Sequence, residues 1–130
     1  MAWSFTDGSL LVPIKLTNPF LEVQYPRHGA VMAAVDTGFT GFVLTPLKVF
    51  QALKLDELKT TPVRGELADG TSIELQAAHG ILEVPEIEHQ DEGLIEANPK
   101  IKEILLGVSG IKKLRTIVNG CKSLLAMEKC

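Results

Sequence analysis

The amino-acid sequence predicts a mostly β fold in one domain, with one or two short helices. Several short runs alternate apolar with polar residues and are separated by the turn-forming residues Gly, Pro, Asn and Asp. Two stretches also combine an apolar strand, a glycine and a short helical pattern. With 130 residues, 45% of them hydrophobic, the chain is long enough to bury a core without metals or disulfides. We therefore expect a single domain over residues 1–130.

The amino-terminal third predicts three strands. Residues 9–16 and 20–26 suit half-buried antiparallel strands, because apolar and polar residues alternate in both and a Thr-Asn-Pro turn separates them. Residues 28–35 are nearly all apolar, so we expect this third strand to be buried on both faces. The third strand brings Asp36 to the edge of the core.

A short apolar strand and a helix are expected next. Thr45 is predicted to cap the helix and Pro46 to occupy its first position, with Leu47, Phe50 and Leu53 at helical spacing. Such a pattern indicates a helix of about nine residues.

The central part of the chain predicts a projecting β-hairpin. In residues 63–87, two strands meet at Asp69 and Gly70, which form one of the strongest hairpin dipeptides, and a third strand follows. The next segment, residues 86–100, contains five acidic residues before its first lysine. Because such a run of charge rarely packs, we expect a solvated acidic loop here.

The carboxyl-terminal part repeats the earlier pattern on a smaller scale. Residues 101–114 predict a buried strand, a glycine and a short helix near Ser109 to Leu114. The chain then forms a last hairpin around Asn119 and Gly120.

Composition excludes several classes of function. The net charge of −3 is unlike the basic footprint of a nucleic-acid-binding protein, and we expect neither a signal peptide nor a membrane span. Cys121 and Cys130 lack metal-ligand spacing and are expected to be free thiols in a reducing cytoplasm. His28, His79 and His89 are far apart in sequence, so we expect surface or turn histidines and no metal or cofactor.

Asp36 raises the main question, because a carboxylate at the end of an apolar strand must be hydrogen-bonded or must serve a function. One interpretation is an Asx turn, in which Asp36 accepts a hydrogen bond from the backbone two residues on and does no chemistry. The other is a catalytic carboxylate. The residue pattern alone leaves both interpretations open.

The segments "VDTGFTGFVLTP", "LADGT" and "ILLGVSGIKKL" resemble, in this order and spacing, the retropepsin-like aspartic proteases, and specifically the small single-domain prokaryotic members. The resemblance covers residues 8–128. It implies a small closed β-barrel-like domain in which the aspartate of the Asp-Thr-Gly motif is catalytic and the second segment forms a flap over the substrate. In the third segment, the two apolar residues and the glycine would precede the one well-formed helix of this family.

The resemblance also implies a role for each residue of the site. Asp36 would be catalytic, the Thr37 hydroxyl would bond across a dimer axis, and Gly38 would let its amide approach the carboxylate. The flap residues that would bind substrate are Leu67, Ala68, Asp69 and Gly70.

An aspartic protease needs two carboxylates about 3 Å apart that share one proton and activate a water. Because this chain has one Asp-Thr-Gly motif, the resemblance implies a homodimeric aspartic endopeptidase that acts on a peptide or protein substrate. Phe39 departs from the small residue common after the glycine, and the flap lacks a glycine-rich tip. The alternative is a catalytically weak or inactive dimeric peptide-binding or assembly module with the same fold.

Overall fold

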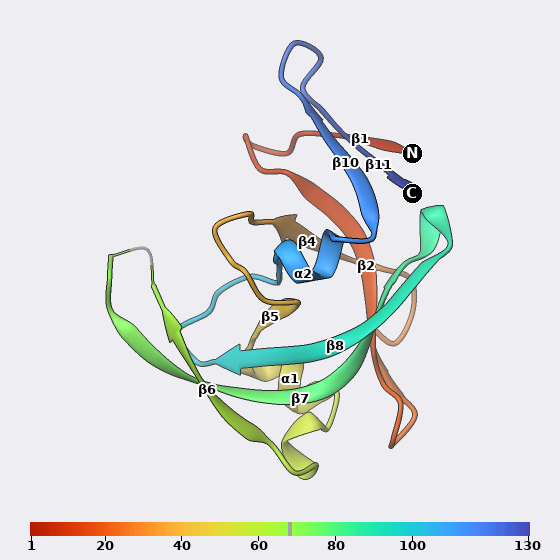
Figure 1. Cartoon of the computed structure of the whole chain (residues 1–130). Helices are drawn as coiled ribbons and strands as arrows, with labels where there is room; N and C mark the ends of the chain where they lie inside the picture. Colours follow the sequence, from red (N-terminus) through yellow and green to blue (C-terminus); the bar gives the residue numbers. More distant parts are fainter. Residues whose placement is uncertain (68) are drawn as a thin grey trace.

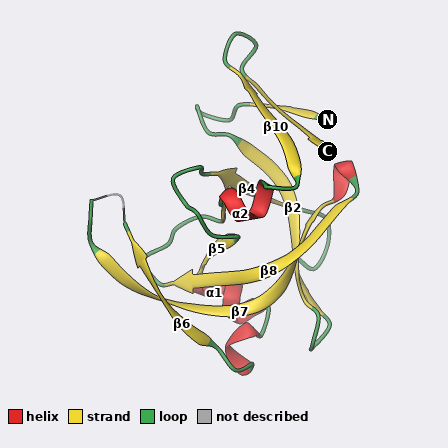
Figure 2. Ribbon diagram, viewed as in Figure 1, coloured by secondary structure: helices red, strands yellow, loops and turns green. Residues whose placement is uncertain are grey.

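The computed structural model describes residues 1–67 and 69–130, and most of them lie in strands (Figures 1 and 2). The α-helices are α1 (Leu47–Ala52) and α2 (Val108–Ile111), and the 3-10 helices are η1 (Leu55–Glu57) and η2 (Pro85–Ile87). The strands are β1 (Ala2–Ser4), β2 (Leu11–Asn18), β3 (Val23–Tyr25), β4 (Val31–Val35), β5 (Val43–Pro46), β6 (Thr61–Glu66), β7 (Ser72–Val84), β8 (His89–Asn98), β9 (Leu105–Leu106), β10 (Leu114–Asn119) and β11 (Leu124–Lys129).

The main sheet closes on itself. Its eight strands follow the order β3-β2-β4-β9-β5-β8-β7-β6, and an additional antiparallel pairing joins β2 to β7. Because Leu16 lies opposite Leu82 in that pairing, the strands from β2 to β7 form a ring. This is the mostly β, barrel-like fold with short helices that the sequence predicts.

The core lies where the ring strands meet α1. β2 shows the predicted alternation, since every second residue from Val12 to Asn18 is buried. Asn18 is fully buried, and its side-chain amide donates to the Leu53 carbonyl (2.9 Å), which ties the end of β2 to the end of α1. The largest fully buried side chains include Phe50, Ile14, Leu16, Leu53, Leu55, Leu82, Ile95 and Leu106.

A second, three-stranded sheet has the order β1-β11-β10 and places the two chain termini side by side (Figure 1). The predicted last hairpin is confirmed, because β10 and β11 pair from Leu114 with Lys129 to Asn119 with Leu124.

The prediction that the strand over residues 28–35 is buried on both faces is wrong. β4 buries only Ala33, while Met32 is 46% exposed. Its two edges pair with β2 and β9, and its inner face contributes Ala33 to the core. The opposite face is open in the single chain, and apolar composition alone could not reveal this.

The predicted helix is present but is shorter, and its cap is different. Thr45 and Pro46 are the last residues of β5, and the buried Thr45 hydroxyl donates to the Glu96 carbonyl (3.2 Å) instead of capping the helix. After Leu53 the backbone of Lys54 turns left-handed (φ +56°), which ends the helix.

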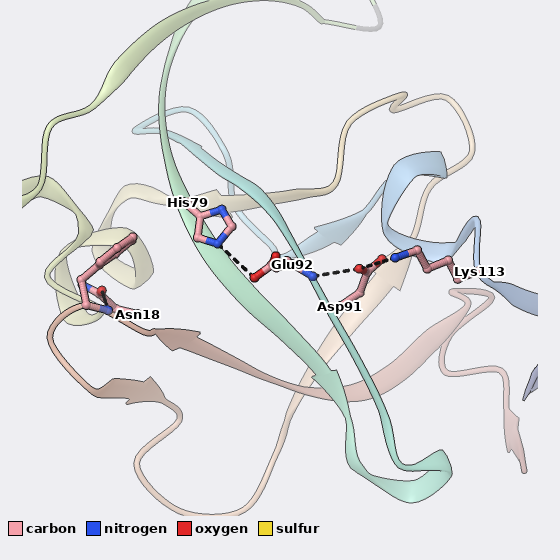
Figure 3. Close-up of polar contacts among 6 residues, drawn as sticks. Asn18, His79, Asp91, Glu92 and Lys113 are labelled. Carbon is pink, nitrogen blue, oxygen red and sulfur yellow. Dashed lines mark hydrogen bonds and ion pairs between the residues drawn. The ribbon is translucent and has the colours of Figure 1, made fainter.

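The prediction of a solvated acidic loop over residues 86–100 is also wrong. Most of this segment is β8, which pairs antiparallel with β7 and parallel with β5. Its polar side chains alternate with inward-facing ones, and Asp91 contacts Lys113 after α2 (3.0 Å), while Glu92 contacts His79 on β7 (3.3 Å; Figure 3). Backbone pairing on both sides thus outweighs the charge of the segment.

The expected third strand after the central hairpin is part of β7. This strand runs without a break over Ser72–Val84 because it is paired along both edges. One edge pairs with β6 at its start and with β2 near its end, and the other edge pairs with β8 from Gln76 to Val84. The predicted hairpin itself is confirmed. It projects from the body of the molecule (Figure 2).

Candidate active site

Asp36 lies at the first position after β4, in a loop that the carboxyl-terminal half of the chain holds in place. Its backbone N–H donates to the Leu106 carbonyl on β9 (2.9 Å), and the Phe39 N–H donates to the Asp36 carbonyl (3.1 Å). β4 and β9 are parallel neighbours. The two strand-glycine units that the sequence indicates are therefore adjacent in space.

The Asp36 carboxylate accepts a hydrogen bond from the Gly38 N–H (2.9 Å). A Cβ at Gly38 would lie 3.1 Å from the same carboxylate oxygen, so the absence of a side chain leaves room for this approach. Asp36 is half-buried, while Thr37 and Gly38 are exposed at the apex of the loop. This hydrogen bond is common to an Asx turn and to a catalytic loop.

The segment around α2 supports this loop from behind. The Val108 N–H donates to the Phe39 carbonyl (2.9 Å), and Ser109 donates from its hydroxyl to the Thr40 carbonyl (3.0 Å) and from its N–H to the Gly41 carbonyl (3.1 Å). Sequence reasoning missed Ser109. A serine in the first turn of a short helix is typical of a helix start, and the sequence does not show that its hydroxyl binds a carbonyl of the distant Asp36 loop.

Gly107 makes this support possible. A Cβ at Gly107 would lie 2.6 Å from the Phe39 carbonyl oxygen and even closer to that of Gly41. The glycine that precedes α2 is therefore required for close packing against the Asp36 loop.

A cleft of about 740 Å³ lies between the Asp36 loop and the β6–β7 hairpin. One wall is the loop and the floor is formed by β5, β8 and β9, while the end of β6 forms the other wall. The cleft residues that carry charge are Asp36, Arg64, Glu66 and Glu96, and the apolar ones are Phe39, Leu44, Val63, Leu67, Leu75, Ile101 and Leu105.

The predicted flap residues occupy different places. Leu67 lines the cleft, whereas Asp69 and Gly70 lie in the exposed turn and Ala68 lies outside the described residues. Leu67 and Gly70 are joined by a backbone hydrogen bond (2.9 Å). Hydrogen bonds from the side chain and backbone of Thr71 lower the pKa of Asp69, so its charge stabilises the turn.

Phe39 brings an apolar ring into the cleft, as its place in the sequence indicates. It packs with the cluster of Leu44, Ile73 and Leu75 on the cleft side of the sheet. The large residue therefore narrows the space next to Asp36.

Glu96 is the feature of the cleft that sequence reasoning missed. It is only 8% exposed, its Oε2 atom is buried without a hydrogen-bond partner among the described residues, and burial raises the pKa of its carboxyl group. Because it belongs to the segment predicted as an acidic loop, nothing in the sequence distinguished it from its exposed neighbours.

The histidines and cysteines lie away from the cleft. His28 is exposed and His79 is partly exposed, but His89 is buried at the start of β8, so the prediction of a surface or turn position is wrong for it. Cys121 and Cys130 are free and exposed. In the described part of the chain, no group of three or more His, Cys, Asp or Glu residues is arranged to hold a metal. Nor is any helix there long and apolar enough to cross a membrane.

The chain has the retropepsin-like acid-protease fold. Its structure matches a retropepsin-like aspartic protease from Rickettsia conorii with a TM-score of 0.70, over 98% of this chain and 88% of that chain, at 15% identity. A simian foamy virus protease matches with a TM-score of 0.49 at 17% identity, over 78% of this chain and 91% of that chain.

In sequence, an uncharacterized protein of Archaeoglobus fulgidus is 29% identical over 126 residues, which span 97% of this chain and 98% of that protein. No family model matches the chain. The fold assignment rests on the Rickettsia conorii structure.

Replacement of Gly70 by valine tests the flap. Gly70 has φ +88°, where a β-branched residue is strained by about 1–3 kcal/mol. We expect Gly70→Val to raise the KM for a peptide several-fold, because the strained turn carries Leu67 over the cleft. Gly29→Val is the matched control, since Gly29 also has a positive φ (+70°) with open space around it but does not line the cleft. Equal KM values for the two variants, at similar loss of stability, would refute a role for the hairpin in binding.

Glu96→Gln tests the protonation state of the buried carboxyl. Because burial raises the pKa of Glu96 above its ordinary value of 4.5, ionisation of this group destabilises the fold as the pH rises through the raised pKa. A glutamine side chain is neutral at every pH, like the protonated acid, so the variant does not lose stability as the pH rises. We expect the variant to equal the wild type near pH 4 and to exceed it at pH 8 by about 1–3 kcal/mol, the usual range for a buried unpaired polar group.

Urea denaturation from pH 4 to pH 8 measures this difference. Glu74→Gln is the control on the neighbouring strand β7, because Glu74 is exposed and takes part in none of the ion pairs found among the described residues. A stability difference that stays constant with pH would show that Glu96 does not ionise in this range.

Proposed function

We propose that the protein is an aspartic endopeptidase that acts as a homodimer, with Asp36 of each subunit in a shared catalytic pair. The proposal rests on one observation above all. The retropepsin-like fold brings Asp36 to the wall of a cleft of about 740 Å³, beside a β-hairpin that borders the cleft on the other side. This arrangement suits an extended peptide between the loop and the hairpin.

The edge of the sheet supports binding of an extended peptide. β6 is the terminal strand of the main sheet, and residues 63–67 in its second half and the following turn all line the cleft. A peptide strand can pair with such an edge, and alternate side chains then point into the cleft or away from it.

The second carboxylate comes from a partner subunit. Each chain has one Asp-Thr-Gly motif, and Thr37 and Gly38 are exposed at the loop apex, where a second loop can approach. In the proposed mechanism the ionised Asp36 takes a proton from a water, which attacks the scissile carbonyl. The protonated Asp36 of the pair donates a hydrogen bond to the developing oxyanion. The mechanism uses neither a metal nor a cofactor.

The proposed site of action is a reducing cytoplasm, since Cys121 and Cys130 are both exposed and free.

The proposed activity is tested by cleavage of an unfolded protein at acidic pH, with and without a statine-containing peptide that mimics the transition state. Cleavage that the mimic blocks supports the peptidase. Peptide binding without cleavage would support the alternative, a dimeric peptide-binding module.

A further inference from the structure

We propose that Glu96 makes the protein select peptides with a basic side chain near the scissile bond, by binding the cationic end of that side chain at the floor of the cleft. This inference rests on the proposed function and identifies the class of substrate for the same site.

The position of Glu96 on β8 directs its side chain to the cleft. Ile95 and Ala97, its two neighbours in the strand, belong to the main core, so Glu96 points to the opposite face of the sheet. On the parallel strand β5, Leu44 lies beside Glu96 and belongs to the cluster on the cleft side. The carboxyl group therefore sits in an apolar floor.

The loop packs closely against one side of this carboxyl group, and Gly41 makes that packing possible. A Cβ at Gly41 would lie 3.0 Å from Glu96 Oε2 and 2.6 Å from Cε1 of the Phe39 ring. The ring and the carboxyl group therefore border the same point above Gly41. The absence of a side chain at Gly41 lets the ring pack against the carboxyl group, and Phe39 and Glu96 line the cleft together.

The Glu96 carboxyl group has no hydrogen-bond or ion-pair partner within the described residues. Its Oε2 atom is buried and makes no hydrogen bond, and the residue takes part in none of the ion pairs found there. A buried carboxylate without a partner is unfavourable, and a cation brought by a ligand removes that cost. Its carboxyl group is thus suited to a ligand that supplies positive charge.

The rest of the cleft favours a basic side chain over an acidic or an apolar one. The charged residues that line it are three acids, Asp36, Glu66 and Glu96, and one base, Arg64. An acidic side chain would be repelled, and an apolar one would leave Glu96 unpaired. The methylene groups of a lysine or arginine can pack on Leu44 and Phe39 while the charged end reaches Glu96, and the aromatic ring adds a favourable contact with the cation.

The test uses pairs of synthetic peptides that differ at one position, with lysine in one and norleucine, an uncharged residue of similar length, in the other. The position is scanned over the three residues on each side of the cleaved bond. At one position, and at a pH high enough to ionise Glu96, we expect the wild type to cleave the lysine peptide with a kcat/KM at least about tenfold higher, a preference that Glu96→Gln removes. Glu92→Gln, on the exposed part of the same strand, keeps the preference.

Binding to the Asp36→Asn protein, followed by fluorescence anisotropy of the same peptides, separates this inference from the proposed function. Cleavage without a basic preference at any position would overturn the role of Glu96 and leave the peptidase intact. No cleavage, but tighter binding of the lysine peptide that depends on Glu96, would keep the role and overturn the peptidase. Absence of a basic preference in both assays overturns the inference.

If Glu96→Gln does not fold, Glu96→Asp serves in its place. The shorter side chain keeps the charge but withdraws it from the cleft by one methylene group. We therefore expect a lysine preference that is weaker than that of the wild type but not abolished. An undiminished preference in Glu96→Asp would count against direct contact between this carboxylate and the substrate.

Discussion

Asp36→Asn is expected to lower kcat/KM by at least about 10²–10⁴-fold, the range for loss of a general acid or base. The fold should stay intact, because an asparagine oxygen can still accept the hydrogen bond that Gly38 N–H donates to Asp36. We therefore expect the free energy of unfolding to change by no more than about 0.5 kcal/mol. Full activity in the variant would refute the peptidase at this motif and favour the Asx-turn interpretation.

Mixtures of wild-type and Asp36→Asn subunits test whether the site needs two chains. If equal amounts exchange freely, about a quarter of the dimers contain two aspartates, whereas subunits that work alone would keep about half of the activity. We expect activity to follow the square of the wild-type fraction, with exchange verified by native mass spectrometry. A linear dependence would show that each chain works alone and would refute the catalytic pair shared between two subunits.

Gly107→Ala is expected to cause the second large effect. The added Cβ would collide with the backbone carbonyls of Phe39 and Gly41, which cannot rotate away as a side chain can. Overpacking of this kind destabilises by about 1–3 kcal/mol. Because the displaced atoms belong to the Asp36 loop, we also expect kcat to fall by at least about tenfold, since small misplacement of reacting groups is costly.

Gly120→Ala is the matched control for this variant. Gly120 lies in the β10–β11 turn, no atom lies within 4 Å of the position that its Cβ would take, and its φ is not left-handed. We expect it to keep both stability and activity. Thermal unfolding and peptide cleavage measure the two effects, and a Gly107→Ala protein with wild-type kcat would show that the contact behind the loop does not position Asp36.

The sequence predicts the parts of this fold that depend on local pattern. The alternation in β2, the left-handed backbone at Gly70 and the closeness of Gly38 to Asp36 all follow from neighbouring residues. The errors arise where distant pairing decides the outcome. Thr45 was expected to cap a helix because it precedes Pro46, but its strand pairs with β8 and buries the hydroxyl.

The candidate site shows the same division. Asp36 was identifiable because its motif is contiguous, whereas Ser109 and Glu96 reach the loop only after the chain has folded. Glu96 was hidden further by its acidic neighbours, since a charged segment reads as solvated unless the pairing of β8 on both sides is known. The apolar run in β4 led to the opposite error. It predicts burial on both faces, but Met32 is exposed.

The ring closure between β2 and β7 has a consequence for the order in which the protein folds during synthesis. β2 ends at Asn18 and its partner residues in β7 are 81–83, while the Asp36 loop is held by residues 106–109 and β1 pairs with β11 at the far end of the chain. Contacts between such distant segments form slowly, because long loops must close before the pairing is rewarded. During synthesis, the Asp36 loop therefore lacks its support until residues 106–109 have left the ribosome. The site proposed here is therefore not assembled before these late segments of the chain have been made.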